Sequence, residues 1–134
     1  MQGLKINDLN IIKNTDGDIF HCLKNDDSGY SDFGEIYFTR INYKKIKAWK
    51  KHKSMTMNLV VPFGEVKFVF YNNEEFFEII ISNKNYKRLT VSPNIWFGFK
   101  GLGENFSLVA NIANIKHDPL ESEKLGLKEI KYIW

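Results

Sequence analysis

The sequence is poor in cysteine and has no long apolar run, and each absence narrows what the protein can be. The chain has 134 residues and one cysteine, so no intrachain disulfide can form and nothing suggests an oxidising compartment. We interpret Cys22 as a small packed residue rather than a catalytic thiol. No apolar run approaches the roughly 18 residues that cross a bilayer, and residues 1–14 do not resemble a signal peptide. We therefore expect a cytoplasmic protein without a membrane partner.

The sequence also has little excess charge. Its formal net charge is +3 and its sequence pI is about 8.9, whereas a nucleic-acid-binding domain usually has a higher pI and a clustered basic face. We therefore expect no nucleic-acid partner. One basic cluster stands out, because residues 44–53 hold six lysines and His52. This cluster could bind phosphate groups locally.

The chain is rich in short β-forming segments. Aromatic residues make up 15% of it, with 11 phenylalanines, which suits a sheet-rich interior. Alternating apolar residues and intervening turn residues predict strands within residues 4–12, 19–23, 35–41, 43–49, 56–61, 65–71, 76–82, 86–91, 95–99 and 106–112. Asp118, Pro119 and Gly126 predict a short helix between them, and the tail 127–134 alternates as if to pair with a sheet edge or a partner subunit. The pattern predicts one all-β domain, a sandwich or barrel of about nine or ten strands over residues 1–134.

The rest of the chain is organised around residues 47–71. This stretch begins with basic residues and continues into two apolar strands across a Pro62-Phe63-Gly64 turn. Charge at a strand edge beside a β-rich core indicates an anionic-ligand site. The other interpretation is a solvated basic edge that prevents aggregation.

The spacing in this stretch resembles the first cupin motif, which is Gly, five residues, His-x-His, three or four residues, Glu, six residues and Gly. Counting back from Gly64, Met57 stands in the Glu place, His52 in the second His place and Lys50 in the first. Residues 92–97 echo the second motif, Pro-x-Gly-x-x-His, with Phe in the His place. The resemblance implies a cupin jelly roll (double-stranded β-helix) of about nine or ten short strands with one short C-terminal helix.

Within the cupins, the chain resembles the deoxysugar branch. Residues 47–50, Lys-Ala-Trp-Lys, are similar to the Arg-Gly-Leu-His segment of dTDP-4-dehydrorhamnose 3,5-epimerases, and residues 89–99 to their Leu-x-Val-Pro-Pro-Gly-x-x-His-Gly-Phe segment. The related 3,4-ketoisomerases carry Arg-Gly-Phe-His-x-His, whose second His matches His52. Asp118 and the terminal Trp134 are similar to the family's C-terminal end. The resemblance implies a homodimeric isomerase acting on a dTDP-4-keto-6-deoxyhexose in surface-polysaccharide sugar biosynthesis.

The chain departs from these families at several functional positions. Lys50 and Phe97 replace family histidines, residues 112–117 hold no counterpart of the catalytic Tyr, and no residue is assigned to the Asp that orients the base. Of the positions that bind metal in other cupins, only His52 keeps a ligand. We therefore expect no metal and no other cofactor.

His52 and Lys50 are the predicted catalytic residues. Isomerising a keto sugar requires a base that removes the proton next to the carbonyl and a group that stabilises the enolate. His52 has a suitable intrinsic pKa for the base, and Lys50 shares its strand face two residues away. Lys50 could stabilise the enolate, depress the pKa of His52, or act as the base itself when desolvated.

Seven further residues are candidates for binding the substrate. Three cations could bind the pyrophosphate, and two of them are the only arginines in the chain. Three aromatic residues could stack on the base or sugar, and one asparagine could bind a hydroxyl or keto oxygen. These candidates are Arg40, Lys47 and Arg88, then Tyr37, Tyr71 and Trp96, and finally Asn58. Each also has an ordinary interpretation as a core residue or a surface ion pair.

Three functions fit these features. The first, which we favour, is 3- and/or 5-epimerisation of a dTDP-4-keto-6-deoxyhexose. The second is 3,4-ketoisomerisation of the same substrate class, which the match of His52 to the second His supports. The third is a non-catalytic sugar-binding cupin, which the substituted histidine and tyrosine positions support.

Overall fold

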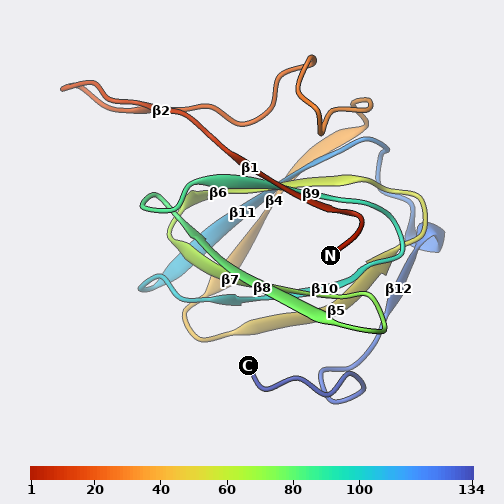
Figure 1. The fold of residues 1–134 in the computed structure, drawn as a ribbon. Coiled ribbons are helices and arrows are strands. Elements are labelled where there is room, and N and C mark those ends of the chain that lie inside the picture. The colour runs from red at the N-terminus through yellow and green to blue at the C-terminus, as the bar shows by residue number, and fades with distance from the viewer.

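Two antiparallel sheets packed face to face form the body of the protein in a computed structural model that describes residues 1–134 (Figure 1). The first sheet has the strand order β1-β9-β6-β11-β4 and the second the order β12-β5-β10-β7-β8. The strands are β1 Leu4–Asp8, β2 Ile11–Ile12, β3 Ile19–Phe20, β4 Glu35–Asn42, β5 Ile46–His52, β6 Met57–Phe63, β7 Glu65–Tyr71, β8 Phe76–Ser82, β9 Lys87–Val91, β10 Trp96–Gly101, β11 Phe106–Ala113 and β12 Ser122–Lys124. The predicted all-β cupin jelly roll is confirmed, with twelve strands instead of nine or ten.

The core lies between the two sheets because the inward positions of the strands are apolar. On β7 the alternating residues Val66, Phe68 and Phe70 are fully buried, as are Leu89 and Val91 on β9. The period of two along each strand places these side chains on one face, where they form one cluster of 16 buried residues. Burying this apolar surface is the main favourable contribution to folding.

The connection between β6 of the first sheet and β7 of the second is tighter than the sequence suggests. Strand β6 continues through Pro62 and Phe63, so Gly64 alone reverses the chain, at φ +89°. A Cβ atom at Gly64 would lie 2.2 Å from Oγ of Ser107. Glycine is therefore required here by both the backbone conformation and the close packing.

The predicted C-terminal helix is replaced by a single 3-10 turn, Pro119–Glu121, followed by β12. Asp118 caps this turn as predicted, since its carboxylate accepts a hydrogen bond from the backbone N–H of Leu120 at 2.9 Å. The chain then becomes extended because residues 122–124 pair with β5 in the second sheet. Sheet pairing thus prevails over the local helix signal, a common outcome for so short a segment.

Two segments extend beyond the sheets. The β2–β3 hairpin projects away from the body beside the first sheet, and the C-terminal tail runs along the outside of the second sheet (Figure 1). The tail forms no strand, but Ile130, Tyr132 and Trp134 pack around Trp49 of β5. The chain contains no helix of the length and apolarity that a membrane span requires.

Candidate active site

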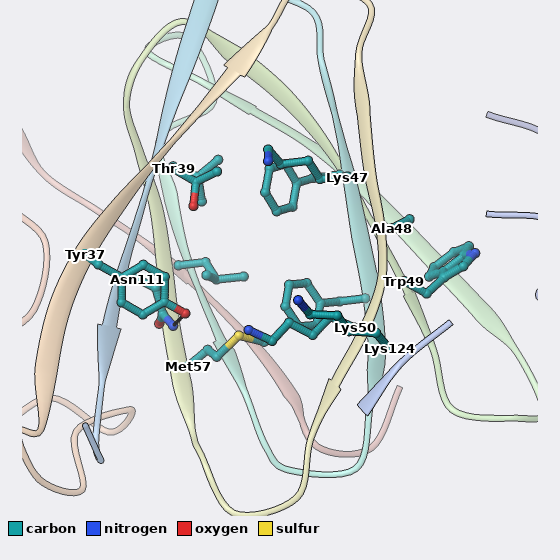
Figure 2. A pocket seen from close by; sticks show the side chains of 13 residues that line it. Tyr37, Thr39, Lys47, Ala48, Trp49, Lys50, Met57, Asn111 and Lys124 are labelled. Atoms are coloured by element: carbon teal, nitrogen blue, oxygen red, sulfur yellow. Dashed lines mark hydrogen bonds between the residues drawn. The ribbon is translucent and has the colours of Figure 1, made fainter. Parts of the chain in front are cut away.

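A cavity of about 350 Å³ opens between the two sheets. One wall comes from β4, β6 and β11 of the first sheet, and the other from β5, β10 and β12 of the second sheet (Figure 2). Its lining is mainly apolar, with a few polar groups from each wall, as is typical of small-molecule sites. The lining residues are Tyr37, Thr39, Lys47, Ala48, Trp49, Lys50, Met57, Leu59, Phe97, Phe99, Val109, Asn111 and Lys124.

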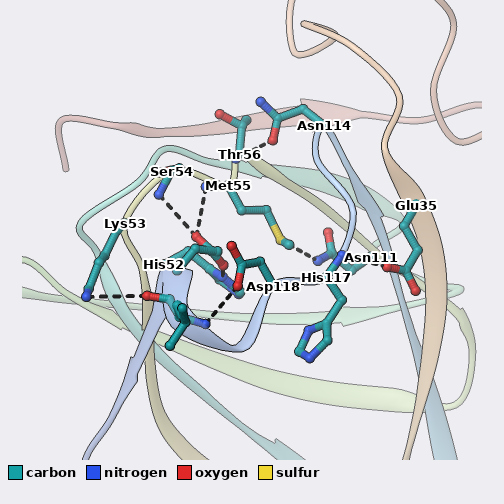
Figure 3. A network of polar contacts seen from close by, with 12 residues as sticks. Glu35, His52, Lys53, Ser54, Met55, Thr56, Asn111, Asn114, His117 and Asp118 are labelled. Atoms are coloured by element: carbon teal, nitrogen blue, oxygen red, sulfur yellow. Dashed lines mark hydrogen bonds and ion pairs between the residues drawn. The ribbon is translucent and has the colours of Figure 1, made fainter.

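His52 forms a hydrogen-bonded pair with Glu121 at one end of β5. The Nδ1 atom of His52 contacts Oε1 of Glu121, and both residues are buried. The second carboxylate oxygen of Glu121 accepts hydrogen bonds from the backbone N–H groups of Ser54 and Met55, at 3.1 and 3.2 Å (Figure 3). These contacts fix the carboxylate, and the carboxylate fixes the tautomer and orientation of the imidazole.

The charges of this pair follow from its surroundings. Burial lowers the pKa of His52, and the hydrogen bond from the ring to Glu121 offsets this only in part. For Glu121, burial opposes ionisation, but the hydrogen bonds from His52, Ser54 and Met55 hold its pKa below the ordinary value. At neutral pH the pair is therefore a neutral imidazole donating from Nδ1 to a carboxylate. Nε2 of His52 keeps its lone pair, and it is buried without a hydrogen-bond partner.

Lys50 lines the cavity and lies on the same face of β5 as His52. Burial lowers the pKa of Lys50, and so does the nearby charge of Lys124, which pairs with Lys50 between β12 and β5. The negative charge of Glu121 opposes this shift. His52 does not itself line the cavity, but its ring stacks on Phe97, which does, with ring centroids 5.9 Å apart. The two predicted catalytic residues thus share one side of the cavity.

Tyr37 lies on the opposite wall, on β4. Its hydroxyl oxygen accepts a hydrogen bond from Nδ2 of Asn111 on β11, at 2.9 Å. Burial raises the pKa of Tyr37, and the hydrogen bond from Asn111 opposes this shift only in part. The phenol is therefore neutral at physiological pH and has a hydrogen to donate.

Comparison with solved structures identifies the family. No protein-family model and no curated protein matches the chain. A dTDP sugar isomerase from Desulfovibrio desulfuricans G20 superposes with a TM-score of 0.91 and 32% identity, covering 95% of this chain and 86% of that one. This chain belongs to the dTDP-sugar isomerase family. It is an isomerase-class enzyme, and the resemblance to the deoxysugar cupins is confirmed.

More distant members of the same fold support the assignment of the architecture. The 3,4-ketoisomerase QdtA from Thermoanaerobacterium thermosaccharolyticum, solved with TDP, has a TM-score of 0.80 at 15% identity, covering 92% of this chain and 88% of its own. The 3,5-epimerase RmlC from Legionella pneumophila, solved with dTDP-4-keto-L-rhamnose, has a TM-score of 0.82 at 16% identity. The match covers 96% of this chain and 75% of RmlC. Both are similar to this chain in fold.

The structure separates five of the predicted binding residues from the cavity of this isomerase. On the first sheet, the guanidinium of Arg40 lies 4.1 Å from the ring centre of Phe106 on the outer face. Asn58 also faces outward, where its Nδ2 donates to the carbonyl of Gly29 and its Oδ1 accepts from Thr90. Arg40 also donates to Oδ1 of Asn42 on its own strand. Both side chains therefore make their contacts away from the cavity, and we leave them out of the proposed site.

The other three residues of this group are likewise occupied elsewhere. Arg88 is buried beneath the N-terminal segment, where Nη1 contacts Asp27 at 3.0 Å. Tyr71 stacks on Phe76, with centroids 4.4 Å apart, and Trp96 packs in the aromatic cluster of the C-terminal tail. None of Arg88, Tyr71 and Trp96 lines the cavity. Lys47 and Tyr37 remain as cavity-lining candidates.

The sequence interpretation missed three polar residues of the site, Glu121, Lys124 and Asn111. The expected helix concealed the first two, because a helical pattern does not place residues 121 and 124 against β5. One signal for Glu121 was available, since a histidine base needs a carboxylate to orient it and the family resemblance includes Asp118 nearby. No group of three or more His, Cys, Asp or Glu side chains is arranged as a metal site.

Proposed function

We propose that the protein is an epimerase of a dTDP-4-keto-6-deoxyhexose. The observation that carries the proposal is that Lys50 of the second sheet and Tyr37 of the first line the cavity from opposite walls, while His52 lies against the lining residue Phe97 on the side of Lys50. Epimerisation requires that a proton leave one face of the sugar ring and that another arrive on the opposite face. A base beside one wall and a phenol on the other meet this requirement.

In the proposed reaction, Nε2 of His52 takes the proton from the carbon next to the carbonyl. The C–H electron pair forms the enolate double bond, and the ammonium of Lys50 stabilises the negative oxygen. Tyr37 then donates its proton to the other face of the same carbon. The imidazolium and the phenolate return to their resting states by exchanging one proton with solvent. Contacts to the base tighten when substrate binds, as is common in enzymes whose unliganded sites are loosely arranged.

The lysines at the cavity favour an anionic substrate. Lys47, Lys50 and Lys124 all line it, and none of these three side chains forms an ion pair. We assign Lys47 and Lys124 to the diphosphate of the nucleotide sugar, since ammonium groups bind phosphate as point charges. The named relatives act on dTDP-linked sugars, which supports the same class here, in cytoplasmic synthesis of sugars for surface polysaccharide.

The test is solvent deuterium exchange into a dTDP-4-keto-6-deoxyhexose, followed by proton NMR. Incorporation at C3 or C5 with inversion is the expected result. The absence of incorporation with dTDP-, UDP- and GDP-linked 4-keto sugars would overturn the proposal.

A 3,4-ketoisomerase is the second candidate, and the presence of Phe97 in place of a second imidazole favours it, because one base suffices to move a proton between C3 and C4. That reaction gives a 3-keto product with its own NMR spectrum.

The protein also has an apolar surface suited to a second copy of the chain. Ile36 and Phe38 of β4 and Phe63 of β6 are 46–62% exposed on the first sheet. The β2–β3 hairpin, which projects beside the first sheet (Figure 1), carries the exposed residues Ile12 and Ile19. Such a patch is typical of an interface, and we assign it to a homodimer. Light scattering after chromatography is expected to give twice the chain mass, and Phe38→Glu to give the monomer.

A further inference from the structure

Asn111 has an unusual position in the cavity wall. Its side chain is only 3% exposed, yet it lines the cavity. The Nδ2 atom donates to the hydroxyl of Tyr37 at 2.9 Å and approaches Sδ of Met55 at 3.6 Å. The Oδ1 atom is buried and has no hydrogen-bond partner. A buried polar atom without a partner is rare and costs free energy, so it calls for an explanation.

The direction of the Asn111–Tyr37 hydrogen bond determines where the phenol can donate. Because Tyr37 accepts from the amide, its own hydrogen is not used in this contact. The phenol has one hydrogen and must direct it elsewhere. No other protein acceptor receives it, and Tyr37 lines the cavity. Its hydrogen is therefore free for a ligand there.

The same hydrogen bond determines what Asn111 can offer. Once Nδ2 is committed to Tyr37, the remaining polar atom of the amide is an acceptor. An acceptor in a cavity wall can be satisfied by a hydroxyl group of a ligand. A hexose carries such donors, whereas the keto oxygen and the phosphates do not.

We propose that Asn111 positions the Tyr37 hydroxyl to donate into the cavity and itself accepts a hydrogen bond from a hydroxyl of the sugar. This inference rests on the proposed function and deepens it, because it assigns the recognition of a sugar hydroxyl to one atom. The two halves of the amide affect different kinetic constants. Loss of the donor impairs Tyr37 and lowers kcat, and loss of the acceptor weakens substrate binding and raises KM.

Two variants of Asn111 separate these effects in the deuterium-exchange assay. Asn111→Leu removes both atoms at similar volume, and we expect kcat to fall about tenfold or more and KM to rise about tenfold, the scale of one hydrogen bond. Asn111→Asp keeps an oxygen but removes the donor, so kcat falls similarly while KM stays within about threefold of wild type. Wild-type kcat in both variants, or an equal KM in wild type and Asn111→Leu, would overturn the inference.

Two further measurements identify a positioning role. In the double variant Tyr37→Phe/Asn111→Leu, kcat should equal that of Tyr37→Phe alone, because Asn111 acts on the proton through Tyr37. Additive losses of kcat would contradict this. Asn58→Ala is the matched control, since Asn58 is a buried asparagine on the outer face of the same sheet. It is expected to lower stability and leave kcat within about twofold.

One readout does not depend on activity. Ultraviolet titration of the tyrosines should show one phenol whose pKa rises in Asn111→Leu, because the amide hydrogen bond lowers the pKa of Tyr37. The difference must vanish in the Tyr37→Phe background. If wild type exchanges no deuterium, the proposed function fails, and this titration still decides the positioning of Tyr37. If wild type exchanges and Asn111→Leu behaves like wild type, only the inference about Asn111 fails.

Discussion

Glu121 and His52 are 69 residues apart in the sequence and form the central polar contact of the site. The same carboxylate also holds the backbone of Ser54 and Met55, directly after β5. The C-terminal segment therefore does more than cover the second sheet. It brings in the group that gives His52 its tautomer and fixes the chain that follows it.

Replacing Glu121 tests this relationship. Glu121→Gln keeps the shape and can still accept from Ser54, but it removes the charge and no longer specifies which nitrogen of His52 carries the proton. We expect the exchange rate to fall about 100-fold, the scale of losing general-base catalysis. Glu123→Gln is the control, because Glu123 pairs with Lys51 at 3.1 Å outside the cavity. Equal exchange rates in the two variants would show that the Glu121 carboxylate has no role in orienting His52 as the base.

The pKa directions of this pair predict how activity and stability depend on pH. Because burial lowers the pKa of His52 below 6.5, the exchange rate should fall with acid only below that pH. The unfolded chain binds a proton on His52 more readily than the folded one, so stability from this group is complete above pH 6.5 and decreases as the pH falls towards the folded pKa. Glu121 also has a lowered pKa, and its contribution is lost below about pH 4.5.

Urea unfolding at a series of pH values between 8 and 4 measures this dependence. Stability should decrease on acidification in wild type, and the part that begins below pH 6.5 should be smaller in His52→Gln. A wild-type stability that rises between pH 6.5 and 5 would contradict the assigned direction. The same His52→Gln protein should have lost the acidic limb of the exchange profile.

The sequence predicted the fold well because its local signals and the sheet agree. The alternation in residues 35–41 and 65–71 is the pattern of strands buried on one side, and both are strands in the structure. The shared face of Lys50 and His52 also follows from the period of two along a strand. These features depend only on neighbouring residues.

What the sequence could not predict depends on distant partners. Arg88 looked like a phosphate ligand, but Asp27 and the carbonyl of Cys22 already bind its guanidinium. Asn111 carried no sequence signal, because its role comes from Tyr37 on the neighbouring strand. The packing of the two sheets decides whether a polar residue on a strand faces the cavity or the solvent. The sequence composition alone does not reveal this.

Adjacent lysines on β5 provide a test of the assigned face. Lys50 lines the cavity, whereas Lys51 faces outward, paired with Glu123 and lying 4.7 Å from the ring centre of Trp96. We expect Lys50→Met to lower deuterium exchange about 100-fold through loss of enolate stabilisation, and Lys51→Met to leave it within about threefold. Similar losses of exchange rate in both variants would mean that the two lysines act through the overall positive charge of the strand, and not through the position of Lys50 in the cavity. If Lys50→Met abolishes exchange while His52→Gln does not, Lys50 is the base.

Gly98 links the packing of the C-terminal tail to the position of the catalytic strand. A Cβ atom there would lie 2.4 Å from Cβ of Ala48 on β5 and 2.9 Å from the ring of Trp134. Gly98→Ala must therefore push β5 and the tail away from β10, and overpacking of this kind costs about 1–3 kcal/mol. Because β5 carries Lys50, activity should fall as well. Thermal and urea unfolding measure the first effect, and deuterium exchange the second.

The control for this variant is Gly126→Ala, since the nearest atom to its added Cβ is a flexible carboxylate oxygen of Glu129 at 3.2 Å. Stability there should change by less than about 0.5 kcal/mol, as at ordinary surface sites. Combining Gly98→Ala with Ala48→Gly removes the shorter of the two contacts and should restore part of the stability and the exchange rate. If the double variant is no more stable than Gly98→Ala alone, contact between β10 and β5 is not what limits residue 98 to glycine.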